Sequence, residues 1–141
     1  MKSLKESFIK AKDLDKISSR ISFKKKDLEL GTIVMFGDGT FGVYIEGTLS
    51  ETIKEDFDFY DAEDKFFIGY VSGVPNSIVC YTNLDTLNDS LIDKYDDDFS
   101  VIRIYGKKLG EQEILEFTRS NFYTSINEIV SSIKEYKDRK L

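Results

Sequence analysis

The chain lacks histidine and tryptophan, and it has one cysteine and one proline among 141 residues. Without histidine, it has neither the commonest general base nor the usual partner of a catalytic nucleophile, and most zinc ligand sets are excluded. The single cysteine, Cys80, excludes an intramolecular disulfide and any site built from four thiolates. Cys80 lies in the apolar run SIVCYTN, which predicts a buried small hydrophobe rather than a reactive thiol.

No apolar run reaches the roughly 18 residues that a membrane span needs, and the N-terminal segment is charged throughout. We therefore expect neither a membrane span nor a secretory signal, and a cytoplasmic location. Internal repeats, low-complexity tracts and Pro- or Gly-rich linkers are also missing, which predicts a single domain over residues 1–141. The composition, 40% hydrophobic and 13% aromatic, is typical of a chain that folds around a packed core.

The net charge of −6 hides a segregation along the chain. Residues 1–26 carry nine basic and three acidic side chains, residues 27–106 carry four and seventeen, and residues 107–141 carry seven and six. The middle segment, with a net charge of −13, repels nucleic acids and anionic membranes, because phosphate recognition needs Lys and Arg. Direct nucleic-acid binding is therefore disfavoured. The basic first segment is interpreted as a solvated helix face, with contact to phosphate as the alternative.

Helical patterns lie at both ends of the chain. SLKE fits a capping box, and apolar residues recur three and four apart after it, which predicts a helix over residues 3–19 with a break near residues 13–15. Residues 111–118 predict a short helix, and a longer amphipathic helix follows, with Lys137, Arg139 and Lys140 at its C-terminal end. The apolar stripe of this long helix predicts packing on a sheet or a homodimer. Its members are Phe122, Ile126, Ile129, Val130 and Ile133, with Tyr136 at the edge.

Strand patterns fill the middle of the chain. Two β-rich runs, residues 32–36 and 40–46, flank Gly37-Asp38-Gly39, which predicts a tight hairpin rather than a phosphate-binding loop, since no helix follows. After a polar connection over residues 47–56, further strands are predicted at FDFYD, KFFIGYVS and SIVCYTN, with a turn over residues 73–76. Residues 84–98 predict a short helix or a wrapped loop, and FSVIRIY a last strand that ends at Gly106.

Together these patterns predict an α+β domain. It consists of a basic N-terminal helical segment over residues 1–26, an acidic β region over residues 27–106, and C-terminal amphipathic helices over residues 107–141. The β region is expected to form a five- or six-stranded antiparallel sheet. Its short strands and tight turns predict a strongly bent sheet or a small barrel.

The remaining candidate chemistry belongs to carboxylates, as an acid–base pair or as ligands of a hard metal ion. DFDFYDAED resembles a calcium loop only superficially, because the glycine and the final glutamate are missing; a strand with a solvated acidic face is preferred. YDDD before the last strand is interpreted mainly as a capped, solubilising turn, with partner binding as the main alternative. We predict no metal site, no cofactor and no catalytic residue. The candidate partner-binding residues are Asp56, Asp58, Asp61, Asp93, Asp96, Asp97 and Asp98.

Two segments, DLELGTIVMFGDGTFGVYIE and YDDDFSVIRIYG, resemble small uncharacterised proteins of phages and prophages of low-GC Gram-positive bacteria. They cover about a quarter of the chain, and no functional residue is carried over from the family. The richness in Lys, Ile, Asn, Asp and Tyr is typical of an AT-rich coding source. The resemblance implies an accessory role, such as that of anti-CRISPR proteins and other inhibitors of host defence.

These observations predict a non-enzymatic protein that inhibits a host defence factor by binding its basic surface through acidic side chains. An immunity protein that neutralises a basic nuclease toxin fits the charge equally well. A sponge for a nucleotide immune signal is a further alternative, but it needs convergent cationic and aromatic groups. The strand region has as cations only Lys54, Lys65, Lys94 and Arg103. A carboxylate-based hydrolase is the enzymatic alternative.

Overall fold

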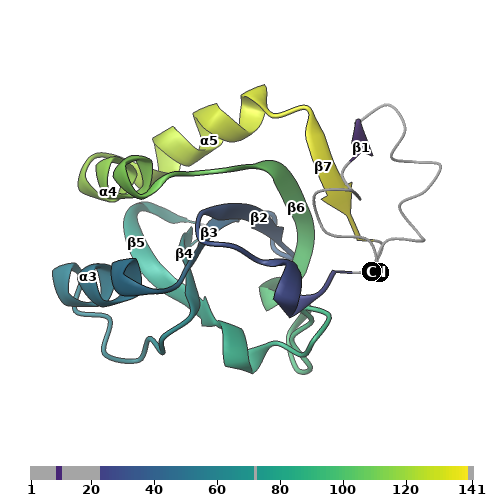
Figure 1. Cartoon of the computed structure of the whole chain (residues 1–141), viewed down its shortest axis with the longest axis horizontal. Coiled ribbons are helices and arrows are strands. Elements are labelled where there is room, and N and C mark those ends of the chain that lie inside the picture. The colour runs from purple at the N-terminus through teal and green to yellow at the C-terminus, as the bar shows by residue number, and fades with distance from the viewer. Residues whose placement is uncertain (1–8, 11–22, 72, 140–141) are drawn as a thin grey trace.

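The computed structural model describes residues 9–10, 23–71 and 73–139. They form an α+β structure with an antiparallel sheet in the order β1-β7-β6-β2-β3-β4-β5 (Figure 1). The sheet is open, with edges β1 and β5, so the predicted small barrel does not form. The strands are β1 (Ile9–Lys10), β2 (Thr32–Phe36), β3 (Phe41–Ile45), β4 (Phe66–Val71), β5 (Val74–Asn83), β6 (Val101–Lys108) and β7 (Glu135–Asp138). The helices are α3 (Thr48–Asp56), α4 (Glu111–Arg119) and α5 (Phe122–Ser132), and the short 3-10 helices are η3 (Lys25–Asp27), η4 (Leu84–Thr86) and η5 (Asp97–Phe99).

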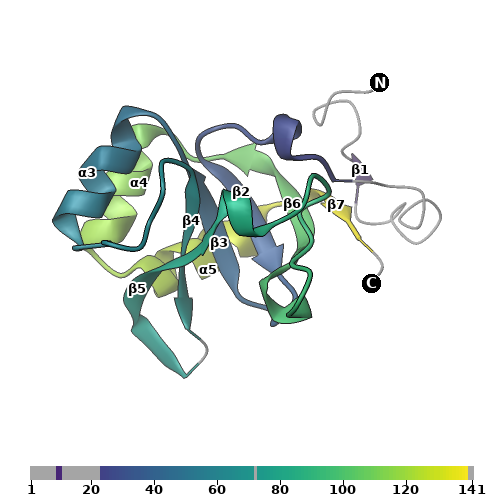
Figure 2. The ribbon, with the colours of Figure 1, turned by 90° about the horizontal axis from the view of Figure 1, so that it is seen from below.

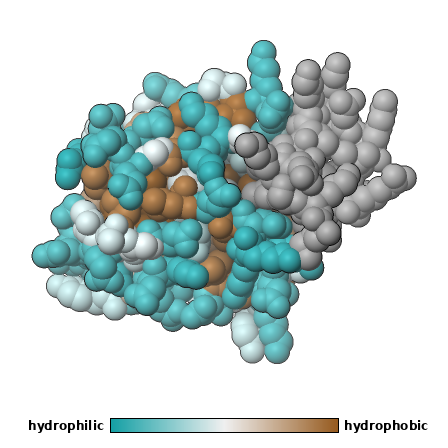
Figure 3. Space-filling view, viewed as in Figure 1, coloured by the Kyte–Doolittle hydropathy of each residue, from teal (hydrophilic) through white to brown (hydrophobic). Residues whose placement is uncertain are grey.

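Both faces of the sheet are buried, because neighbouring residues of the central strands point into two separate cores. One core lies under the helices, and the helix residues in it are Leu49, Ile53, Ile114, Phe122 and Ile126. The other lies under the irregular segments before β2 and before β6, which contribute Phe23, Leu28, Leu84, Leu87 and Leu91. Residues 84–98 are therefore the predicted wrapped loop, closed over the sheet by its leucines. Figure 3 shows apolar residues gathered between the α4–α5 pair and the strands, on a face that is otherwise mostly hydrophilic.

The β2–β3 hairpin confirms the prediction from Gly-Asp-Gly. Gly39 has a φ of 86°, and the Asp38 carboxylate accepts a hydrogen bond of 3.0 Å from the backbone N–H of Thr40. The short side chain of Asp38 thus closes a turn that glycine makes accessible.

The polar connection predicted over residues 47–56 is wrong, because Thr48–Asp56 form helix α3 and Gly47 is its N-cap. Leu49 and Ile53 lie four residues apart, on one side of the helix, and both are buried in the core. The predicted strand at FDFYD is wrong as well: residues 57–65 are turns, and Phe57 and Phe59 pack from them against the same core. Because α3 is short and has only these two buried apolar residues, its helical periodicity is hard to detect in the sequence.

The long C-terminal helix is also wrong in its second half. Helix α5 ends at Ser132, and the next residues form β7, which pairs with β6. Gly106 lies inside β6, not at its end, and a side chain there would come within 3.1 Å of the backbone oxygen of Glu135. The Arg103 guanidinium, 3.1 Å from the Asp138 carboxylate, joins the two strands. The pairing of β7 with the distant strand β6 thus outweighs the helical spacing of apolar residues that continues to Tyr136.

Smaller differences concern the remaining boundaries. Most of the helix predicted over residues 3–19 lies outside the described residues, and the described pair Ile9–Lys10 is a strand paired with β7. The turn predicted over residues 73–76 is shorter, because β5 already begins at Val74. Helix α4 confirms the prediction over residues 111–118.

Candidate acidic binding surface

The first group of predicted residues lies at the end of α3 and in the turns after it. Asp56 is the last residue of α3, and Asp58 has a left-handed φ of 53°. The Asp58 carboxylate accepts a hydrogen bond of 3.3 Å from the Tyr60 hydroxyl. All three predicted aspartates of this group, including Asp61, are exposed.

The second group lies in the loop before β6, where two of its carboxylates shape the backbone. Asp93 accepts hydrogen bonds from the backbone N–H groups of Tyr95, at 2.8 Å, and Asp96, at 3.0 Å. Asp96 in turn caps η5 by accepting a 2.9 Å bond from the N–H of Asp98. The interpretation of YDDD as a capped turn therefore holds for Asp96. The side chains of Asp97 and Asp98 are exposed, and in the described part of the chain no hydrogen bond or ion pair involves them.

This second loop is fixed against the β2–β3 hairpin. The Gly37 N–H donates to the Ser100 carbonyl at 2.9 Å, and the Cα of Gly37 lies so close that a Cβ would be 2.0 Å from the Asp97 carbonyl oxygen. Tyr81 of β5 stacks on Phe36, with 4.3 Å between ring centroids. Its hydroxyl donates to Asp38, and burial raises its pKa, so the tyrosine stays a neutral donor. The loop therefore presents Asp97 and Asp98 from a rigid base.

The first loop is fixed by a side chain two residues further along β5. The Asn83 carboxamide accepts a hydrogen bond of 2.8 Å from the Glu63 N–H and donates one of 3.0 Å to the Asp61 carbonyl. Because Asn83 pairs with Phe66 across the β4–β5 ladder, the residues just before β4 meet those just after β5. The result is a hollow of about 530 Å³ lined by Glu63, Asp64, Lys65 and Asp85.

Glu63 and Asp85 form a close pair of carboxyl groups in this hollow. A hydrogen bond from one to the other raises the pKa of Glu63, and burial and the charges of Asp85 and Asp64 raise it further. The pair therefore holds a proton more tightly than separate carboxylates do. One nearby cation, Lys54, lies 3.5 Å from Asp64 and 3.1 Å from Glu51.

The C-terminal half of β5 thus connects the two acidic loops that the sequence places far apart. A register shift in the β4–β5 ladder at Tyr81 lets Tyr81 contact one loop while Asn83 holds the other. We call the resulting surface the acidic end of β5; its carboxylates are Asp38, Asp61, Glu63, Asp64, Asp85, Asp97 and Asp98. Of the predicted residues, it includes Asp61, Asp97 and Asp98. Among the described residues, no side-chain hydrogen bond or ion pair joins Asp56 or Asp58 to this surface, and Asp93 and Asp96 bond the backbone of their own loop.

Asp38, Glu63, Asp64 and Asp85 are not among the partner-binding residues predicted from the sequence, although the last three belong to its acidic segments. Only the ladder register brings the last three together, and a ladder register has no local signal. For Asp38, the sequence predicts a role in the hairpin turn but not its hydrogen bond with Tyr81.

Metal-ligand clusters and ionised thiols are the remaining chemistry to look for at this surface. Among the described residues, no three His, Cys, Asp or Glu side chains are placed to hold a metal ion. Cys80 lies nearby, but burial, with Asp61 and Glu63, raises its pKa to about 12, so its thiol stays protonated at neutral pH.

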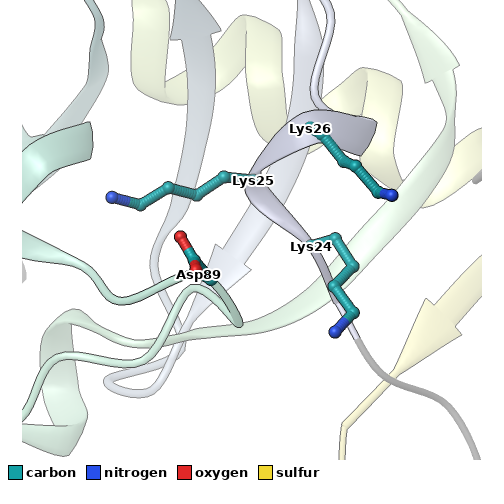
Figure 4. A pocket seen from close by; sticks show the side chains of 4 residues that line it. All are labelled: Lys24, Lys25, Lys26 and Asp89. Carbon is teal, nitrogen blue, oxygen red and sulfur yellow. The ribbon is translucent and has the colours of Figure 1, made fainter.

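A second hollow has the opposite charge. It has a volume of about 360 Å³ and is lined by Lys24, Lys25, Lys26 and Asp89, and the N–H of Lys25 donates to the Asp89 carbonyl at 2.9 Å. Figure 4 shows the three lysine side chains pointing in different directions, with the Asp89 carboxylate on the side of Lys25. A phosphate site needs cations that converge, so this geometry does not favour the nucleotide-sponge alternative.

Two further cations, Lys137 in β7 and Arg139 just after it, lie over the ring of Phe23. The guanidinium of Arg139 lies 4.4 Å and the ammonium of Lys137 5.6 Å from the centre of the Phe23 ring. Burial lowers the pKa of Arg139 to about 10 and also lowers that of Lys137. Cation–π contact with Phe23 offsets part of this desolvation. These residues are thus part of the fold, not the exposed end of a helix.

The comparisons with other proteins add no family. The chain matches no protein-family model, no curated protein and no solved structure. In the described part of the chain, no helix has the length and apolar character that spanning a bilayer requires.

Proposed function

We propose that the chain is a non-enzymatic binding protein that inhibits a basic partner protein through the acidic end of β5. The observation that carries this proposal is that two side chains of one strand reach two separate acidic loops. The Asn83 carboxamide bonds the backbone of Asp61 and Glu63, and the Tyr81 hydroxyl lies 3.5 Å from the carbonyl oxygen of Asp98. Loops that are ordered before binding lose little conformational entropy when the partner arrives. Concentrated negative charge also accelerates association with a basic surface.

The Glu63–Asp85 pair supports a cationic partner in particular. A hydrogen bond with Asp85 is the main cause of the raised pKa of Glu63, and the repulsion between the two carboxyl groups when both are ionised raises it further. An arginine or lysine placed between them removes that repulsion, and arginine can bind both groups at once. The partner's cation therefore gains more here than at an isolated surface carboxylate.

Nucleic-acid-binding proteins are the class of partner that this surface fits best. Their binding sites expose Lys and Arg for phosphate, and a row of carboxylates can occupy such a site in place of phosphates. The resemblance to phage accessory proteins suggests a host defence factor as the target. A nuclease toxin bound by an immunity protein has the same basic surface, and the identity of the captured protein separates the two.

The proposal is tested by affinity capture from cells that carry the gene. The chain is immobilised, the bound proteins are eluted with increasing salt and then with DNA, and they are identified by mass spectrometry. We expect one basic nucleic-acid-binding protein that both treatments release, because both compete with charge pairs. Capture of a neutral or acidic protein that resists salt, or of a nucleotide released by heating, would contradict the proposal.

A further inference from the structure

Two tyrosine rings of the acidic loops lie almost entirely in solvent. Tyr60 is 91% and Tyr95 is 89% exposed, whereas the next most exposed aromatic residue in the described part of the chain, Tyr123, is 37% exposed. Rings in this position contribute nothing to the core, although aromatic side chains normally gain much from burial. The packing of the fold therefore does not account for the placement of Tyr60 and Tyr95.

Both tyrosines occur in the same four-residue sequence, Asp-x-Tyr-Asp, at residues 58–61 and 93–96. In each case the first aspartate fixes the turn. The backbone N–H of Tyr60 donates to the Asp58 carbonyl at 2.9 Å, and that of Tyr95 donates to the Asp93 carboxylate at 2.8 Å. Each ring is therefore presented from an ordered backbone, and a tyrosine side chain has few rotatable bonds to immobilise on binding.

The two turns flank the acidic end of β5. Figure 2 shows the turn after α3 and the loop before β6 on the side that faces the viewer, on either side of the C-terminal end of β5. Asp61, whose carbonyl accepts a hydrogen bond of 3.0 Å from Asn83, directly follows Tyr60. Asp97, with an exposed side chain, follows Tyr95 along the second loop. Each ring thus lies close in sequence to a carboxylate of this surface.

A cation is the group that suits both a tyrosine ring and its flanking carboxylates. The face of an aromatic ring attracts positive charge, and the ammonium of Lys94 already lies 5.6 Å from the centre of the Tyr95 ring. An apolar side chain would leave the carboxylates desolvated without a partner, and a nucleic acid would bring its phosphates against them. Arginine fits better than lysine, because its planar guanidinium can stack on a ring while its N–H groups bond a carboxylate.

We propose that Tyr60 and Tyr95 are aromatic anchors that stack on arginine side chains of the basic partner, one on each side of the acidic end of β5. This inference rests on the proposed function and narrows the partner to a protein that exposes arginines rather than lysines. Aromatic anchors supply much of the binding energy of an interface, whereas the surrounding carboxylates mainly accelerate association and exclude wrong partners.

The test is a titration of labelled oligoarginine and oligolysine of equal length with the full chain, followed by fluorescence anisotropy at physiological ionic strength. We expect the wild type to bind oligoarginine about tenfold more tightly than oligolysine. Tyr60→Ala/Tyr95→Ala should lose this preference, because it removes both stacking surfaces. Tyr60→Phe/Tyr95→Phe keeps both rings and should keep the preference.

Two controls separate the rings from their surroundings. Asp61→Asn/Asp97→Asn removes charge but leaves the rings, so it should weaken the binding of both peptides while oligoarginine remains preferred. Tyr123→Ala removes a partly exposed tyrosine of α5 and should change neither affinity. Circular dichroism melting checks that each variant is folded. Because the rings of Tyr60 and Tyr95 are exposed, their removal should leave the Tm nearly unchanged.

Equal affinity of the wild type for the two peptides would overturn the proposal. So would a preference that survives in Tyr60→Ala/Tyr95→Ala or disappears in Tyr60→Phe/Tyr95→Phe. Failure of the proposed function gives a different result: capture from cells yields no basic protein, while the tyrosine-dependent preference for oligoarginine holds. Equal capture of one basic protein by the wild type and by Tyr60→Ala/Tyr95→Ala would instead leave the proposed function standing and refute the aromatic anchors.

Discussion

Replacing Gly37 by alanine should destabilise the fold more than replacing Gly39, although Gly39 is the residue with a left-handed backbone. The added Cβ at position 37 would lie 2.0 Å from the carbonyl oxygen of Asp97, and that oxygen belongs to backbone. A carbon and a carbonyl oxygen normally stay about 3.3 Å apart, so the loop before β6 must move by about 1 Å. At Gly39 the added Cβ has no heavy atom within 4 Å.

The magnitude follows from what this movement breaks. The 2.9 Å hydrogen bond from the Gly37 N–H to the Ser100 carbonyl is lost. The Tyr81 hydroxyl also loses its 3.5 Å contact with the carbonyl oxygen of Asp98 in this loop. A buried hydrogen-bonding group left without a partner costs about 1–3 kcal/mol, so we expect about 2–4 kcal/mol for Gly37→Ala. Gly39→Ala pays only the strain of a left-handed alanine, about 1 kcal/mol.

Thermal unfolding followed by circular dichroism measures both variants. For a chain of this size, about 1 kcal/mol corresponds to about 3–4 °C, so Gly37→Ala should lower the Tm by about 6–16 °C and Gly39→Ala by about 3–4 °C. Chemical denaturation gives the free energy of unfolding independently. An equal or larger decrease of the Tm in Gly39→Ala would refute the reasoning that the loop containing Asp97 packs directly against Gly37.

Three further predictions concern single side chains. In carboxyl-detected NMR titrations, Glu63 should protonate at a pH above its ordinary pKa of 4.5, and Asp85→Asn should move its pKa toward that value. Because the pKa of Glu63 is raised in the folded state, the shared proton stabilises the fold fully below pH 4.5, and this stabilisation is lost as the pH rises through the raised pKa. A wild-type titration in which the pKa of Glu63 is not raised would exclude the Glu63–Asp85 pair. Cys80, with a pKa of about 12, should react with a thiol reagent at neutral pH about a thousandfold more slowly than a free thiol, and an ordinary rate in the folded chain contradicts its burial. Ile53→Ala should cost about 2–5 kcal/mol in denaturant unfolding against less than about 0.5 kcal/mol for the exposed neighbour Thr52→Ala, and equal costs would mean that α3 does not bury this face.

The parts of the fold that local chemistry determines were predictable from the sequence. Gly37-Asp38-Gly39 has the residue types of a tight turn, and the structure has a hairpin there. The apolar spacing of residues 111–118, and of the first half of the long helix predicted after them, likewise specifies the helices α4 and α5. The central strands are predictable as continuous apolar runs, because side chains that are buried on both faces of a sheet are mostly uncharged.

The errors lie where long-range pairing decides the structure. The residues of β7 continue the period of α5, yet they form a strand because β6 offers Gly106 for close approach and Arg103 for Asp138. Nothing near residue 135 in the sequence signals a partner some thirty residues earlier. Helix α3 has only two large apolar residues that are buried in the core, so its own sequence gives a weak helical pattern. Its packing on the core stabilises the helix instead.

The candidate site follows the same division. The acidic character of residues 27–106 is a matter of composition, and the capping role of Asp96 follows from the preference of aspartate for turns. The meeting of Glu63 with Asp85 depends on the pairing of Phe66 with Asn83, which composition cannot specify. The sequence therefore predicted an acidic surface but not which carboxylates share it.

The most direct test of the proposed function is affinity capture with two variants that remove equal charge from different surfaces. One variant neutralises four exposed carboxylates at the acidic end of β5: Asp61→Asn, Glu63→Gln, Asp64→Asn and Asp85→Asn. The control neutralises four exposed carboxylates elsewhere: Glu111→Gln, Glu116→Gln, Glu128→Gln and Glu135→Gln. We predict that the wild type and the control capture the same basic protein and that the first variant loses it. Equal capture by both variants, or loss in the control alone, would contradict binding through the acidic end of β5.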